Sequence, residues 1–354
     1  MEMIIKEFDG QLKTLTSFSN SLKSLIESFL LNDGIEIHTI TARVKDRKSL
    51  EKKIILKGRY SELSDITDIV GLRIITHYSD DVDRIAKIVE REFFIDKKNS
   101  IDKRASLDPD RFGYLSLHYV VGLKKDRLNL TEYSHFNGFK AEIQIRSILQ
   151  HTWAEIEHDT GYKSNTGIPD SIRRRFSRLA GLLEIADDEF VEIKKALERH
   201  KIKIERDLKN GANNIPIDQV SLIEYINSSD AINSLAAELH EKHGFAISKK
   251  ASENYLTAIL LHLSHYQIQT IKDLDDNLKM NHENIFKLLS ETITKPESEM
   301  PRQFIISYLT QVLAIKDGNL EEISKYVDIL RDNKISHSEQ LREILYKKYE
   351  SLFK

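Results

Sequence analysis

Cysteine is absent from the 354 residues of this sequence. Disulfide bonds, zinc sites built on thiolates and cysteine nucleophiles are therefore excluded. The sequence also lacks a charged-then-apolar secretory start, and it contains no run of about 18 apolar residues that would predict a membrane span. We therefore expect a cytoplasmic protein that does not cross a membrane.

Neither sign of charge is in large excess. Lysine and arginine total 53, and aspartate and glutamate total 56, which gives a formal net charge of -3 when histidine is neutral. This balance provides no overall field to hold a polyanion, so binding of a nucleic acid would require a local basic patch. The length exceeds that of one ordinary domain and predicts two globular units with separate cores.

Strand and helix patterns alternate through the first half of the sequence. Apolar residues at spacings of three and four before Asn32-Asp33-Gly34 predict an N-terminal helix over 1–34. The irregular placement of the later helices favours an α+β fold with a mixed sheet over a doubly wound one. Strands are predicted at 35–40, 68–76, 114–123 and 139–147, and helices before Gly58, over 80–94 and from Ile148.

After Pro169 the pattern is helical to the end of the sequence, apart from one break. That break, KNGANNIPID at 209–218, is rich in Gly, Asn and Pro and is the best candidate for a domain boundary. We predict an N-terminal helix (1–34), a mixed α and β domain with a long trailing helix (35–208), a linker (209–218) and an all-α domain (219–354).

Four short stretches concentrate the residues that carry chemistry. In DIVGLRI, Asp68 enters a strand, Gly71 leaves the backbone bare, and Arg73 follows. A carboxylate beside a basic group suits a site for Mg²⁺ and phosphate, because Mg²⁺ takes one or two carboxylates and its other oxygens from phosphate and water. Alone, the same residues are equally typical of a surface salt bridge.

A second carboxylate lies in AEIQIRS. Strand alternation places Glu142, Gln144 and Arg146 on one face, which by itself is typical of a solvated face of a half-buried sheet. Together with Asp68, however, Glu142 would complete the pair of oxygen ligands that phosphoryl-transfer sites use to hold metal against polyphosphate.

The third stretch, FGYLSLH, alternates Tyr114, Ser116 and His118 on one face after a glycine. A tyrosine ring can stack on a base while the serine and histidine reach its polar edges or phosphate. The fourth, ARVK, opens a basic cluster whose guanidinium groups can grip phosphate and stack on purines. This cluster contains Arg43, Lys45, Arg47, Lys48, Lys52 and Lys53.

In this order, the four stretches resemble the synthetase domain of the RelA/SpoT family, including the small alarmone synthetases. ARVK followed by Ser49, then DIVGLRI, FGYLSLH, and AEIQIRS running into HTWAEIEHDTGYK, cover Arg43 to Lys163. The resemblance implies a nucleotidyltransferase-like mixed sheet flanked by helices. It also implies a Mg²⁺-dependent GTP pyrophosphokinase that moves the β,γ-diphosphate of ATP to the 3′-hydroxyl of GTP or GDP, giving (p)ppGpp and AMP.

For the donor nucleotide, the resemblance assigns arginines to the adenine, lysines to the phosphates and Asp68 to Mg²⁺. Glu142 would be the second carboxylate, either on the metal or as acceptor of the proton of the attacking hydroxyl, and both roles stay open. Gln144 would orient that hydroxyl. The residues implied for ATP are Arg43 and Arg73 at the adenine, and Lys45 with one of Lys52 and Lys53 at the phosphates.

For the acceptor, the resemblance implies a stacking aromatic, groups at the phosphates and a far wall. These are Tyr114 at the base, His118 and Arg146 at the phosphates with Ser116 beside them, and Glu157, His158, Tyr162 and Lys163 at the wall. Because in-line transfer needs positioning and charge neutralisation more than covalent chemistry, no nucleophilic side chain is expected.

The identity of the acceptor stays open. Asp108 and Asp110 stand where relatives that make guanosine alarmones often carry basic residues, so the 3′ end of tRNA and adenine nucleotides are alternatives. The run SIRRRFSRL, which includes Arg173 and Arg178, suits a nucleic-acid backbone or an anionic allosteric ligand, but equally a solvated helix face or a homo-oligomer contact.

Two further expectations concern the rest of the chain. Bifunctional relatives place a His-Asp metal pair in a hydrolase before the synthetase, whereas His158-Asp159 here lies inside the synthetase motif. We therefore predict no hydrolase activity. The helical domain is expected to be regulatory or oligomerising.

Overall fold

The computed structural model describes residues 1–102, 116–159, 169–212, 214–251, 255–292, 299–316, 318–332 and 339–353. The chain divides into two compact units, Met1–Lys194 and Lys195–Lys354. Five residues singled out in the sequence lie outside the described ranges: Asp108, Asp110, Tyr114, Tyr162 and Lys163.

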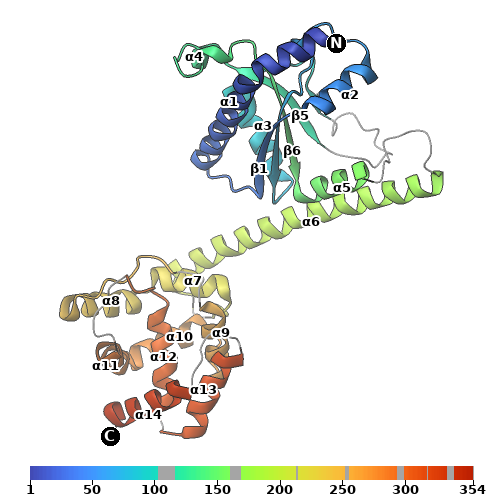
Figure 1. The fold of residues 1–354 in the computed structure, drawn as a ribbon. Helices are drawn as coiled ribbons and strands as arrows, with labels where there is room; N and C mark the ends of the chain where they lie inside the picture. Colours follow the sequence, from blue (N-terminus) through green and yellow to red (C-terminus); the bar gives the residue numbers. More distant parts are fainter. Residues whose placement is uncertain are drawn as a thin grey trace. The chain divides into compact units, whose positions relative to one another are not determined.

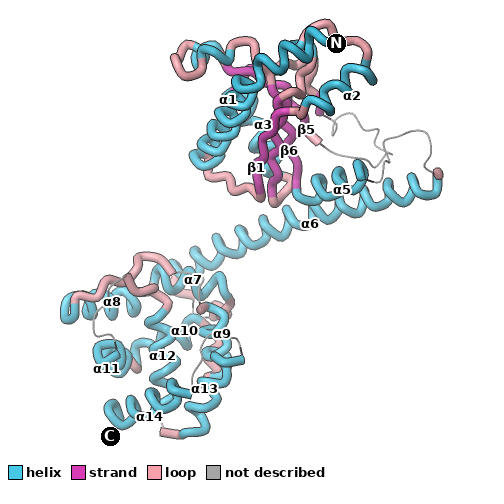
Figure 2. The backbone as a smooth tube through the Cα atoms, viewed as in Figure 1, coloured by secondary structure: helices cyan, strands magenta, loops and turns pink. Residues whose placement is uncertain are grey.

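A mixed six-stranded sheet forms the centre of the first unit (Figures 1 and 2). Its order is β1-β2-β6-β5-β3, with β4 also paired to β5. Only the β2–β6 pair is parallel among the described strands, which confirms the predicted α+β class with a mixed sheet. The strands are β1 (Thr39–Val44), β2 (Val70–Thr76), β3 (Phe93–Ile95), β4 (Ile101–Asp102), β5 (Leu117–Leu123) and β6 (Ala141–Ser147).

Helices cover the apolar face of this sheet. Alternation along β2 and β6 places Leu72, Ile74, Ile143 and Ile145 in a core that the apolar stripes of α1 and α3 complete. The opposite face of the same strands is left for polar side chains. The helices of the first unit are α1 (Glu2–Asn32), α2 (Arg47–Lys57), α3 (Asp80–Glu92), α4 (Lys125–Leu128), α5 (Ile148–Asp159) and the first part of α6 (Asp170–Lys209), with single 3₁₀ turns at Leu63–Asp65 and Ser134–Phe136.

The first strand lies further along the chain than its predicted position at 35–40. β1 covers Thr39–Val44 because its backbone pairs with β2, from Thr39 opposite Ile75 to Val44 opposite Val70. Ile35 instead closes the core after α1. The error arose because this edge strand alternates polar and apolar residues only weakly, so the pairing partner rather than the local pattern fixes its position.

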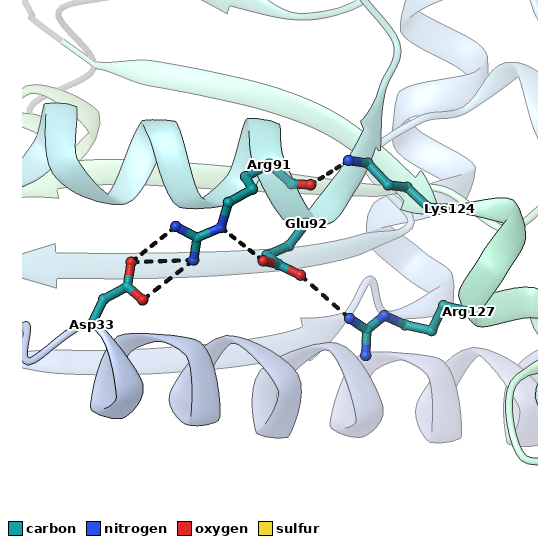
Figure 3. Close-up of polar contacts among 5 residues, drawn as sticks. All are labelled: Asp33, Arg91, Glu92, Lys124 and Arg127. Carbon is teal, nitrogen blue, oxygen red and sulfur yellow. Dashed lines mark hydrogen bonds and ion pairs between the residues drawn. The ribbon is translucent and has the colours of Figure 1, made fainter.

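Ion pairs join the ends of three helices of this unit (Figure 3). The guanidinium of Arg91, at the end of α3, contacts Asp33 beyond α1 at 3.2 Å and Glu92 at 2.8 Å. Glu92 also contacts Arg127 of α4 at 3.4 Å, and Lys124 donates a hydrogen bond to the carbonyl of Arg91. The network fixes α1 and α4 against the end of α3. None of its five residues is a predicted site residue.

The second unit is all-α within its described residues, as predicted. Its helices enclose one large apolar core and a smaller one shared by α12, α13 and α14. The helices are α7 (Gln219–Ser228), α8 (Asp230–His243), α9 (Leu256–His265), α10 (Ile271–Met280), α11 (His282–Thr292), α12 (Phe304–Ile315), α13 (Leu320–Asp332) and α14 (Glu339–Phe353). Throughout the described ranges, no helix combines the length and the apolarity that crossing a bilayer requires.

Helix α6 belongs to both units. The division between Lys194 and Lys195 falls inside this helix, which continues to Lys209. The break at 209–218 follows the end of α6 directly, and we retain it as a proposed domain boundary.

Candidate active site

Strand register places the predicted residues in neighbouring rows on the polar face of the sheet. Residues that are opposite one another in adjacent strands have side chains on the same face, about 5 Å apart. Two such rows cross the centre of the sheet. Read across it, they are Arg43, Gly71 and Glu142, and then Arg73, Gln144 and His118.

Asp68 lies at the entrance to β2 between two lysines. Its Oδ2 is 3.1 Å from Nζ of Lys45 and 2.6 Å from Nζ of Lys53. Its Oδ1 is buried and accepts no hydrogen bond from the described residues. Lys45 follows β1 and Lys53 comes from α2, whereas the neighbouring Lys52 is exposed. Of the two lysines predicted for the phosphates of ATP, Lys53 is therefore the one that pairs with Asp68.

A chain of hydrogen bonds runs through the carboxylate of Glu142. Its Oε1 is 2.9 Å from Nδ1 of His118 and accepts a bond of 2.7 Å from the amide of Gln144. The amide oxygen of Gln144 accepts a bond of 2.8 Å from Arg146. On the other side, Ser116 Oγ lies 2.7 Å from Nε2 of His118. These five predicted residues therefore form one connected group.

The surroundings of Glu142 keep it ionised. Burial acts to raise the pKa of its carboxyl, but hydrogen bonds from His118 and Gln144, with the charges of His118 and Lys53, lower that pKa to about 2. Lys53 therefore acts on both carboxylates, through its ion pair with Asp68 and through its charge near Glu142. Sequence reasoning missed the contact between His118 and Glu142, because it depends on β5 being the neighbour of β6.

The two predicted adenine-binding arginines lie on this face. The side chain of Arg43 passes over Gly71, where an added Cβ would be 4.0 Å from its Cγ and Nε. Arg73 pairs with Glu155 of α5 at 3.0 Å. Burial, followed by the charge of Arg73, lowers the pKa of His151 on the same helix. Glu155 and His151 were not predicted, and no sequence signal distinguished them from other polar residues of α5.

Helix α5 begins directly after β6 and carries part of the predicted far wall. Ser147 starts it with a reciprocal cap, since its backbone N–H donates to Gln150 at 3.0 Å and its Oγ accepts from the N–H of Gln150 at 3.1 Å. Glu157 is buried near the end of the helix, and His158 is exposed.

Carboxylates are the groups in this site that are suited to a metal. No cluster of three or more His, Asp or Glu side chains with metal-binding geometry occurs among the described residues. Asp68 and Glu142 nevertheless fit Mg²⁺, which needs only one or two carboxylates when phosphate and water complete its shell. The buried, unbonded Oδ1 of Asp68 and the low pKa of Glu142 both agree with that use.

Comparison with known proteins places these residues in a family. The family described as the region found in RelA / SpoT proteins matches residues 42–167. The GTP pyrophosphokinase YjbM of Bacillus subtilis (strain 168) is 30% identical over 181 residues, which are 50% of this chain and 82% of that protein. The chain belongs to the RelA/SpoT family. The matched segment of this RelA/SpoT protein contains every predicted site residue, from Arg43 to Lys163.

Two further similarities involve the same organism. The GTP pyrophosphokinase YwaC of Bacillus subtilis (strain 168) is 29% identical over 173 residues, which are 48% of this chain and 79% of that protein. The crystal structure of small alarmone synthetase 1 from Bacillus subtilis bound to its product pppGpp is 26% identical, with coverage of 55% of this chain and 99% of that chain and a TM-score of 0.46.

Proposed function

We propose that this RelA/SpoT protein is a GTP pyrophosphokinase that transfers the β,γ-diphosphate of ATP to the 3′-hydroxyl of GTP or GDP. The products are (p)ppGpp and AMP. The observation that carries the proposal is that one lysine, Lys53, pairs with the carboxylate of Asp68 and also lowers the pKa of Glu142 through its charge, on the polar face of a mixed sheet. Membership of a family whose relatives are GTP pyrophosphokinases supports it.

The donor side of the site is built by β1, α2 and β2. Arg43, with open backbone at Gly71 beneath it, and Arg73 offer flat guanidinium groups for the adenine. Lys45 and Lys53 offer ammonium groups for the phosphates of ATP. Since both lysines contact Asp68, the phosphates would be held next to that carboxylate.

The acceptor side is built by β5, β6 and α5. Arg146 and His118 would bind the acceptor phosphates, and Gln144, fixed between Glu142 and Arg146, would orient the ribose. Ser116 fixes the ring of His118 from the other side. We propose Tyr114, His158, Tyr162 and Lys163 for the remaining acceptor contacts.

Catalysis in this scheme is positioning plus charge neutralisation. Asp68 and Glu142 would hold Mg²⁺, which when bound neutralises charge on the transferred diphosphate. Lys45 and Lys53 add positive charge at the same place. The lowered pKa of Glu142 keeps its carboxylate ionised, as is required both for holding the metal and for accepting the proton of the 3′-hydroxyl.

One observation favours a second acceptor. Arg173, Arg174, Arg175 and Arg178 are exposed on α6, and Arg173 is paired with Asp170. Such a row of guanidinium groups suits the backbone of a nucleic acid. Transfer to the 3′ end of tRNA is therefore the alternative. Cytoplasmic location, a homo-oligomer and the absence of hydrolase activity remain proposals.

Product analysis tests the function directly. Purified protein is mixed with ATP labelled in its β,γ-phosphates, MgCl₂ and, in separate tubes, GTP, GDP, ATP or deacylated tRNA. Chromatography should show label on GDP or GTP and equimolar AMP. Label on tRNA alone would replace the proposal with its alternative, and no transfer to any acceptor would refute it.

A further inference from the structure

A buried hydrogen bond ties the long helix α6 to the end of the catalytic strand β6. The Oγ of Ser147, the last residue of β6, donates to Oδ2 of Asp187 at 2.5 Å. Both side chains are almost completely enclosed, with relative exposures of 0% for Ser147 and 4% for Asp187. Burial raises the pKa of the Asp187 carboxyl, so its enclosure carries an electrostatic cost that a purely structural apolar contact would avoid.

A small displacement of Ser147 would also move residues of the proposed site. It follows Arg146, the residue proposed for the acceptor phosphates, and it caps the first turn of α5 through Gln150. The hydroxyl of Thr76, its partner in the parallel register, donates to the carbonyl of Tyr78 at 2.6 Å and lies 3.3 Å from the carbonyl of Arg146. The bond to Asp187 is thus one of the restraints that fix the end of β6 and the start of α5.

A second contact holds α6 along the same edge of the first unit. Nζ of Lys194 lies 3.4 Å from carboxylate oxygens of Asp80 and of Asp81, at the beginning of α3. The same Nζ is 4.8 Å from the centre of the ring of Tyr78. Polar contacts therefore attach two turns of α6 to the first unit. Asp187 contacts the end of β6, and Lys194 contacts the beginning of α3.

We propose that Asp187 is a positioning residue of the synthetase site, which acts through Ser147 to hold Arg146 and the start of α5 where the acceptor nucleotide binds. This inference rests on the proposed function, since it assigns Arg146 to the acceptor.

The test uses the full chain and the variants Asp187→Ala, Asp187→Asn and Ser147→Ala, with the double variant Ser147→Ala/Asp187→Ala. Asp188→Ala is the matched control, because Asp188 is adjacent on α6 but exposed. Initial rates give separate KM values for ATP and for GTP. The single tryptophan, Trp153, is buried on α5 and reports the packing of that helix by its fluorescence.

Asp187→Ala should raise the KM for GTP about tenfold, a loss of about 1.4 kcal/mol, while the KM for ATP changes less than about twofold. Trp153 emission should shift to longer wavelength. Asp187→Asn should recover most of the acceptor affinity, because its amide oxygen can still accept from Ser147. The double variant should be no worse than Ser147→Ala, because Ser147→Ala already lacks the bond to Asp187 as well as the cap on Gln150.

Equal loss for both substrates, or a fall in thermal stability with unchanged KM values, would overturn the inference and leave Asp187 a structural residue. Failure of the proposed function is recognised separately. If the wild-type chain transfers no diphosphate, calorimetric titration with GDP still compares acceptor binding among the same variants. No difference in GDP affinity between Asp187→Ala and Asp188→Ala would refute the positioning role by itself.

Discussion

The two units of the chain differ in the partners of some of their polar side chains. In the first unit, Glu142, Gln144 and Arg146 are joined to one another across neighbouring positions of one strand. In the second unit, Arg302 donates to the carbonyl of Ile226 at 2.7 Å, and the Nε2 of His262 lies 3.0 Å from the carbonyl of Tyr326. The three residues of the first unit thus bind one another, whereas Arg302 and His262 bind backbone carbonyls, with one further bond from Arg302 to the side chain of Asn233.

This difference separates a site from a scaffold. Side chains that donate to backbone carbonyls satisfy the hydrogen-bond acceptors of helix ends and turns. Substituting such side chains lowers stability. Polar side chains that hydrogen-bond to one another on the polar face of a sheet can bind a ligand. The same is true of lysines around a carboxylate that has one oxygen without a hydrogen bond. The first unit has such an oxygen at Asp68, inside the segment 42–167 that the family matches.

The largest expected effect comes from removing either carboxylate of the site. Asp68→Ala or Glu142→Ala should lower diphosphate transfer by at least about 100-fold, because each variant removes charge stabilisation at the reacting phosphates. Both variants should remain folded, with the lower melting temperature in Glu142→Ala, which also loses the bonds to His118 and Gln144. Chromatographic rates and melting curves, measured beside the exposed control Glu36→Ala, check both statements. Near-full activity in either variant would show that the metal is misplaced.

A smaller effect, confined to the second unit, follows from His262. Burial lowers its pKa from 6.5 to about 4, so between these values the unfolded chain binds a proton that the native unit does not. Stability should therefore fall as the pH falls through this window, by about 1.4 kcal/mol per pH unit. His262→Phe keeps the ring against Tyr326 and should reduce this slope.

Circular dichroism follows the helices in this experiment, and Trp153 fluorescence follows the first unit alone. The control His243→Gln, at an exposed position, should keep the slope of the wild type. Glu142 also has a lowered pKa, but its contribution to stability is lost only between 4.5 and about 2 as acid is added. Simultaneous loss of both signals between pH 6.5 and 4 would contradict the separation of the two units.

The smallest effect is expected at the ion pairs of Figure 3. Arg127→Ala removes the contact with Glu92 at 3.4 Å and the guanidinium 5.2 Å from the ring centre of Phe29. Because these groups are partly solvated, unfolding free energy should fall by only about 0.5 kcal/mol, and less in high salt. Urea melts at two salt concentrations measure this. A loss above about 2 kcal/mol would mean that the network is a buried determinant of the fold.

Local patterns in the sequence predicted most of the elements, including α3, α5, α6 and the mixed sheet, because apolar spacing and turn residues are local properties. They misplaced β1 and could not distinguish Lys53 from Lys52, since each depends on which segments become neighbours. The contacts of His118 with Glu142 and of Ser147 with Asp187 depend on the same long-range choices.

The family resemblance supplied what local patterns lacked, namely which polar residues belong together. It gave no role to Glu155, which lies inside a shared motif, and it could not reach Asp187, which lies outside them. Roles for Tyr114, Tyr162 and Lys163, outside the described ranges, stay predictions.

The parallel pairing of β2 with β6 has a consequence for how the sequence of this protein can change during evolution. The two strands are neighbours in the sheet, yet all residues of β3, β4 and β5 lie between them in the chain. On the proposed assignment, the donor nucleotide is bound by residues encoded before this interval and the acceptor largely by residues within and after it. Substitutions and length changes in the interval can therefore alter the accepted nucleotide while the ATP-binding half is inherited unchanged.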